Sequence, residues 1–121
     1  MKDQVLSIEQ MQKLKELGVD ASKASMTWFR GGESIDYDLG IYSKSISGLY
    51  EFVPTFTLQD MIELMPNNVK YEGKSYYLSI DKKFVGYIDD MDVEDCVLES
   101  EGNILENTFK VLVWLAEHKY I

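Results

Sequence analysis

Hydrophobic residues recur at helical spacing near the start of the chain, directly after a polar capping residue. Ser7-Ile8-Glu9-Gln10 has the form of a capping box, in which the serine hydroxyl and the glutamine side chain each satisfy a backbone amide. Ile8, Met11 and Leu14 follow on one face, and Gly18 supplies a left-handed stop. The pattern predicts a helix over residues 8–17.

Two further segments carry the same kind of start signal. Thr57-Leu58-Gln59-Asp60 repeats the capping arrangement, and Pro66 ends the helix that it predicts. A third helix is expected from Asn103 as cap to about Lys119. Its apolar stripe is broad for a helix with one solvated face, and consists of Leu105, Phe109, Val111, Leu112, Trp114, Leu115 and Ala116. Such a stripe indicates a helix packed on a sheet, or one that reserves part of its surface for a partner.

Between the helices the pattern changes to strands. Residues 24–30 and 35–41 flank a Gly-Gly turn, and residues 75–80 and 84–88 flank an Asp-Lys-Lys turn, so both pairs are expected to be hairpins. Residues 93–98 fit either an edge strand or a loop. The order helix–strand–strand–helix–strand–strand–helix predicts an α+β fold, with an antiparallel sheet of about four strands and three helices on one face.

A duplicated helix–hairpin unit is one interpretation of this order. Residues 7–14 align with residues 57–64 at an offset of fifty, and a hairpin is expected after each. Two duplicated halves would build one continuous sheet. The alternative is that two helices converged on a common start signal. With no linker or low-complexity segment, residues 1–121 are expected to form a single domain.

The hydrophobic content and the distribution of charge indicate a protein with a folded core that does not bind nucleic acid directly. The hydrophobic fraction of 45% is ample for a core, and the formal net charge is −9. Residues 1–30 hold five basic and four acidic residues, whereas residues 31–121 hold seven basic and seventeen acidic ones. Because binding to nucleic-acid phosphates requires clustered lysine or arginine, direct contact with DNA or RNA is not expected.

The acidic excess is concentrated in one run near the end of the chain. Eight carboxylates and no lysine or arginine lie between residues 89 and 106, namely Asp89, Asp90, Asp92, Glu94, Asp95, Glu99, Glu101 and Glu106. The run is either a solvated loop or a surface offered to a basic partner. The first five of these acids are the predicted partner-binding residues.

Candidate chemistry is otherwise sparse. Asp90, Asp92, Glu94 and Glu101 mimic positions 1, 3, 5 and 12 of a calcium loop, but Asp95 occupies the glycine position, so no metal site is predicted. The single histidine, His118, is expected to complement the end of the third helix. No catalytic residue and no cofactor are predicted, and the chain is not expected to be an enzyme.

The lone cysteine, Cys96, indicates a reducing compartment, and no apolar run is long enough for a signal peptide or membrane helix. The chain is therefore expected to be cytoplasmic, with no membrane contact. Ten aromatic residues exceed what a small core encloses comfortably: Trp28, Phe29, Tyr37, Tyr42, Tyr50, Phe52, Tyr76, Tyr77, Tyr87 and Trp114. They predict either half-buried sheet positions or a patch that serves a partner or a homodimer.

The stretches SIEQMQKLKELGVDASKASMTW, PTFTLQDMIELMP and VLVWLAEHKYI together resemble short hypothetical proteins of prophages and mobile elements from gut bacteria. Residues 31–50 and 82–102 are the least similar. The resemblance carries no known activity or site, but it implies an intracellular accessory role.

The sequence therefore predicts a non-enzymatic, acidic protein-interaction module of phage or mobile-element type. The alternative is an acidic inhibitor or immunity-like protein that imitates the charge of nucleic-acid phosphates.

Overall fold

The computed structural model describes residues 4–31, 36–41, 50–81, 84–89, 92–96 and 103–121. The chain separates into two compact units, Met1–Asp60 and Met61–Ile121, and each is described by itself. The prediction of a single domain therefore stays a prediction. The elements in chain order are α1 (Ile8–Glu16), β1 (Met26–Gly31), β2 (Asp38–Ile41), β3 (Tyr50–Thr55), α2 (Leu58–Leu64), β4 (Asn68–Tyr71), β5 (Lys74–Ile80), β6 (Val85–Asp89), β7 (Asp92–Cys96) and α3 (Ile104–Glu117).

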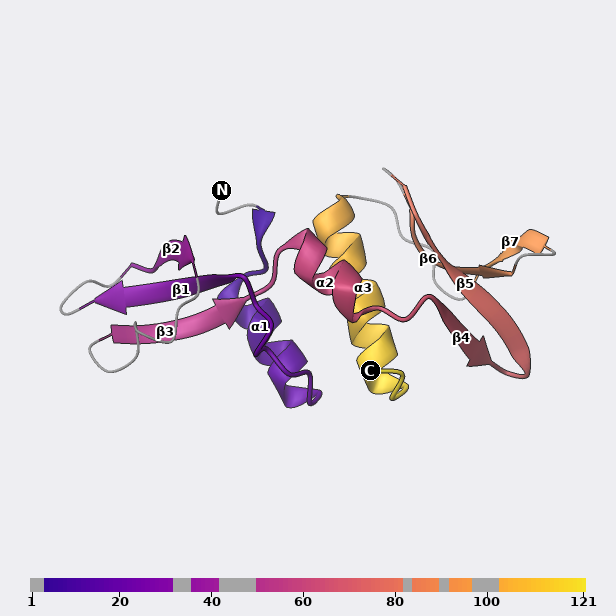
Figure 1. Cartoon of the computed structure of the whole chain (residues 1–121), viewed down its shortest axis with the longest axis horizontal. Coiled ribbons are helices and arrows are strands. Elements are labelled where there is room, and N and C mark those ends of the chain that lie inside the picture. Colours follow the sequence, from indigo (N-terminus) through magenta and orange to yellow (C-terminus); the bar gives the residue numbers. More distant parts are fainter. Residues whose placement is uncertain (1–3, 32–35, 42–49, 82–83, 90–91, 97–102) are drawn as a thin grey trace. The chain divides into compact units, whose positions relative to one another are not determined.

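The first unit contains an antiparallel sheet in the order β2-β1-β3, against which α1 packs through β3 (Figure 1). Leu6 ties the N-terminal segment to this sheet. Its backbone amide donates to the Phe56 carbonyl at 3.1 Å, and its own carbonyl accepts from Trp28 Nε1 at 2.9 Å and Thr55 Oγ1 at 2.7 Å. Leu6 and Phe56 are fully buried, so these polar contacts lie within the core.

The second unit contains an antiparallel meander in the order β4-β5-β6-β7, and α3 packs against β6 (Figure 1). β4 and β5 are joined at Glu72 and Gly73, whose φ angles are 52° and 82°. A two-residue turn with two positive φ angles matches the right-handed twist of the flanking strands. The core face of this sheet carries Val69, Tyr76, Val85 and Tyr87, all of which are buried.

The α+β class and the three helices are confirmed, but the predicted number and arrangement of strands are wrong. Instead of about four strands in one sheet, the described residues form seven strands in two sheets. β3 was not among the predicted strands, and it contains Pro54, a residue that is unfavourable within a sheet. Proline is tolerated there because β3 lies at the end of its sheet. The other missed strand, β4, is only four residues long and follows a polar turn.

Strand order also bears on the duplication hypothesis. The two predicted strand pairs are present, β1 with β2 and β5 with β6, but the unpredicted strand β4 lies between α2 and the second pair. However, the first strand after α1 is central in its sheet, whereas the first strand after α2 lies at the end of its sheet. The two sheets therefore differ in topology, and they do not form the continuous sheet that duplication predicted.

The predicted helix starts are confirmed at atomic detail. The Ser7 amide donates to Gln10 Oε1 at 2.8 Å, and the Gln10 amide donates to Ser7 Oγ at 3.1 Å, which completes the capping box. The Thr57 and Asp60 pair makes the same two contacts, at 3.0 and 3.1 Å. Asn103 caps α3 by accepting from the Glu106 amide at 3.0 Å.

Both α1 and α3 end in a Schellman motif. After α1, the Val19 amide donates to the Leu14 carbonyl at 3.0 Å across the left-handed Gly18. After α3, the Tyr120 amide donates to the Leu115 carbonyl at 2.8 Å across Lys119, which is also left-handed. The Schellman motif therefore has glycine at its left-handed position after α1 and lysine, which carries a Cβ, at the same position after α3.

Substitutions at these two positions should have opposite effects. Gly18→Ala should lower the free energy of unfolding by about 1 kcal/mol, because its φ of 87° penalises a Cβ although no atom lies within 4 Å of it. Lys119→Gly should raise that free energy by about 0.5 kcal/mol, because glycine adopts a φ of 62° without strain. Urea unfolding measures both changes, and shifts of the same sign would contradict the expectation.

Candidate functional site

The predicted partner-binding acids lie at the end of the four-stranded sheet. Asp89 is the last residue of β6, and Asp92, Glu94 and Asp95 belong to β7. Asp90 lies outside the described residues. We call these five residues the acidic edge. Figure 1 shows β7 at one end of the sheet, and among the described residues β7 pairs only with β6.

The register brings two of these acids into opposition. Asp89 and Asp92 are paired Cα positions across β6 and β7, and Ile88 is paired with Cys96. The register shifts between Ile88 and Asp89, so that Glu94 and Asp95 fall between the two paired positions. Irregularities of this kind are common at sheet edges and next to binding sites, where they redirect side chains.

Acidic residues on an end strand have two general roles. They attract a basic partner through complementary charge, and they discourage edge-to-edge aggregation. Both roles follow from a concentration of negative charge where the backbone of the sheet ends.

Asp89 of the acidic edge follows a buried part of β6 in the second unit. Val85, Gly86 and Tyr87 precede Asp89 on β6 and are all buried, and α3 packs against this strand. Tyr87 donates from its hydroxyl to the Pro66 carbonyl at 2.7 Å.

The calcium-like spacing is not accompanied by a calcium-loop backbone at the positions that can be compared. Asp92 and Glu94 lie in the extended strand β7, whereas a calcium loop turns around its ion at those positions. Asp90 and Glu101 lie outside the described residues. Among the residues that the structure describes, no group of three or more histidine, cysteine or acidic side chains is arranged to hold a metal ion.

His118 takes part in an aromatic cluster, a feature that sequence reasoning missed. Its ring stacks on Trp114 with centroids 4.4 Å apart, and Trp114 also contacts Tyr71 and Tyr120, each at 5.4 Å. Nδ1 of His118 lies 2.9 Å from the Trp114 carbonyl, which places a proton on Nδ1. The cluster fixes the end of α3, and the spacing of four residues between Trp114 and His118 is the sequence signal for it.

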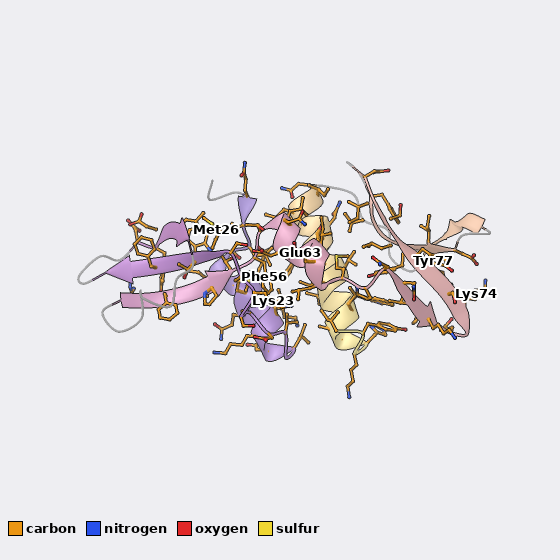
Figure 2. The ribbon with its side chains drawn as sticks, in the orientation of Figure 1. Lys23, Met26, Phe56, Glu63, Lys74 and Tyr77 are labelled. Carbon is orange, nitrogen blue, oxygen red and sulfur yellow. The ribbon has the colours of Figure 1, made fainter. Side chains whose placement is uncertain are left out.

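Several of the ten aromatic residues singled out in the sequence are buried or packed against other rings. Trp28, Tyr76 and Tyr87 are buried, and Trp114 lies in the cluster above. Tyr77 on β5 is the exception, with 45% of its surface exposed (Figure 2). Tyr42 lies outside the described residues. The side chain of Tyr50 is not described either, and among the aromatic side chains that are described only the Tyr77 ring is largely exposed.

Among the described residues, no helix is both long and apolar enough to cross a membrane. Comparison with protein families, with curated proteins and with solved structures gives no match for this chain. The resemblance to prophage proteins therefore stays a prediction, and the function has to be argued from the chain's own residues.

Proposed function

We propose that this chain is a non-enzymatic interaction module whose acidic edge binds a basic segment of another protein. The observation that carries the proposal is the concentration of acidic residues on β6 and β7, at the end of the four-stranded sheet. Lysine or arginine from a partner would meet these acids. Complementary charge of this kind accelerates encounter and selects among partners more than it adds affinity.

The placement of these acids on an end strand also supports this proposal. A strand with one neighbour leaves backbone groups on its other side for a partner strand, and charged side chains restrict which strand can approach. A basic extended segment satisfies both requirements at once. In this proposal the protein acts in the cytoplasm as an accessory of a phage or mobile element, in keeping with the resemblance in its sequence.

An inhibitor that imitates nucleic-acid phosphates is the second candidate, favoured by the run of eight carboxylates without lysine or arginine between residues 89 and 106. Its target would be the basic cleft of a nucleic-acid-binding protein. The two candidates share the acidic edge and differ in what competes for the partner. If the partner is a nucleic-acid-binding protein, duplex DNA should displace the chain from its basic cleft. If the partner is a basic protein that does not bind nucleic acid, DNA should leave the complex intact.

Neutralising the opposed pair should weaken partner binding. We expect Asp89→Asn with Asp92→Asn to reduce affinity at least about tenfold for a partner captured from bacterial lysate, identified by mass spectrometry and then purified. The matched control removes two acids from exposed helix positions, Glu16→Gln with Glu117→Gln, and should bind as the native chain does. Titration at low and moderate salt measures both variants.

The dependence of partner binding on salt concentration also tests the proposal. Exposed charges are screened over about 10 Å at 0.1 M salt, so binding through the acidic edge should weaken as salt rises. Binding that is unchanged by salt and by neutralisation would contradict the proposal. The solution mass of the free chain, measured alongside, tests the homodimer alternative.

A further inference from the structure

The first unit contains a pocket that is separate from the acidic edge. It lies between α1, the residues that follow α1 and the end of β3, where α1 packs near the C-terminal end of β3 (Figure 1). Its volume is about 420 Å³, within the range of pockets that hold small molecules. The lining residues are Met11, Gln12, Leu14, Lys15, Val19, Asp20, Ala21, Phe52, Val53 and Pro54.

Most of the lining is apolar, and the fold holds it in place. Met11 and Leu14 are buried on the inner face of α1. The Schellman motif turns the chain so that Val19 follows Leu14 into the same wall. Val53 is in register with Trp28 of the central strand β1, which fixes the opposite wall. An apolar cavity with walls on a helix and a sheet favours an apolar ligand body.

The polar side chains that line the pocket differ in whether they are free to form hydrogen bonds with a ligand. The Asp20 carboxylate already accepts from the Ser22 amide and hydroxyl, both at 2.9 Å, and these bonds lower the pKa of Asp20. By contrast, Gln12 and Lys15 are exposed, and neither has a side-chain hydrogen bond or ion pair within the described part of the chain. These two side chains are three residues apart on α1, and hence are neighbours on its surface. Both can donate to an acceptor.

We propose that this pocket binds a small amphipathic carboxylate, with its apolar body against Leu14, Val19 and Val53 and its carboxylate at Lys15 and Gln12. An ammonium and an amide that donate to one carboxylate form charge-assisted hydrogen bonds, which are shorter and stronger than neutral ones. The Asp20 carboxylate also lines the pocket and opposes such a ligand, but Asp20 is exposed to solvent, where the high dielectric constant of water reduces the repulsion.

The volume sets the size of the ligand. A pocket of about 420 Å³ lies toward the lower end of the range for small-molecule sites, which limits the ligand to a small molecule. A straight-chain carboxylate of about ten carbons fits within that limit. Decanoate is therefore the probe, and decanol is its uncharged counterpart.

The experiment is a titration of the full chain with decanoate below its micelle concentration, followed by amide chemical shifts. We expect saturable shifts at Leu14, Val19 and Val53, and binding of decanol at least about fivefold weaker. Lys15→Met keeps the apolar stem and removes the charge, so it should weaken decanoate about fivefold and abolish the preference over decanol. Lys13→Met, an exposed position of α1 outside the lining, is the matched control and should behave as the native chain does.

A second variant tests the cavity itself. Ala21→Phe fills the pocket from a half-buried position and should abolish the shifts caused by both probes. Several outcomes would overturn the proposal: no saturable shift with decanoate, equal affinity for decanol, shifts confined to other residues, or undiminished binding by Lys15→Met. None of these readouts involves the acidic edge, so the outcome is independent of the proposed function.

Discussion

Tyr87→Ala is expected to lower the free energy of unfolding by about 4 kcal/mol and the melting temperature by about 15 °C. Tyr87 is the largest fully buried side chain of the second unit, and it lies on β6, against which α3 packs. Truncation would leave a cavity of ring size and would also orphan the Pro66 carbonyl, which accepts from the phenol at 2.7 Å. Thermal and urea unfolding followed by circular dichroism measure the loss.

Two companion variants separate packing from hydrogen bonding. Tyr87→Phe keeps the ring and removes the hydroxyl, so it should cost about 1–2 kcal/mol. Tyr77→Ala removes a ring of the neighbouring strand that is 45% exposed, and should cost less than about 1 kcal/mol. A loss for Tyr77→Ala as large as that for Tyr87→Ala would contradict the assignment of the core face.

Burial also gives Tyr87 a signature at alkaline pH. It raises the pKa of Tyr87 well above its ordinary value of 10.0. The unfolded chain therefore releases this proton first, so the native chain keeps its full stability below pH 10 and loses stability as the pH rises above it. Tyr87→Phe should lose less stability over that alkaline range.

Asp60→Ala is expected to cost about 3 kcal/mol, the second largest effect. The Asp60 carboxylate accepts from the Thr57 amide at 3.0 Å, the Ser25 amide at 3.0 Å and the Ser25 hydroxyl at 2.5 Å. It thus caps α2 and at the same time fastens the chain just before β1. Hydrogen bonds to a charged group each contribute more than neutral ones, and a lost cap alone costs about 1 kcal/mol.

The dependence of stability on pH follows from the same contacts. Burial of the Asp60 carboxyl would raise its pKa, but the hydrogen bonds from Ser25 and Thr57 outweigh it, and the pKa lies below its ordinary value of 3.8. Because the folded pKa is the lower one, the contribution is complete above about pH 5 and is lost as the pH falls below 3.8. Asp60→Ala should flatten this part of the acid-unfolding profile.

Two controls define the source of the effect. Ser25→Ala removes only the hydroxyl contact and should cost about 1 kcal/mol, with little further loss when it is combined with Asp60→Ala. Asp38→Asn changes an exposed aspartate on β2 and should leave the unfolding curve unchanged. Additive losses for Ser25 and Asp60 would indicate that the two residues act independently.

The sequence by itself determined the features that depend on neighbouring residues. Helix starts were predictable because a capping residue and its amide partners lie within three positions, as for Ser7 with Gln10 and Asn103 with Glu106. The stop at Gly18 was predictable because a left-handed residue favours glycine. The equivalent stop at Lys119 was not, since lysine carries no such preference.

Only the tertiary structure decided how distant segments meet. β3 is a strand despite Pro54 because it pairs with β1 on one side only, and no local pattern states which side of a strand stays open. Asp60 was predicted as a cap, whereas its bonds to Ser25 join residues 35 positions apart. The acids of residues 89–95 were visible in the sequence, but the opposition of Asp89 and Asp92 depends on a register shift. Register is set by pairing across the sheet. The sequence therefore predicted where the negative charges lie along the chain, but not which of these residues are opposite one another.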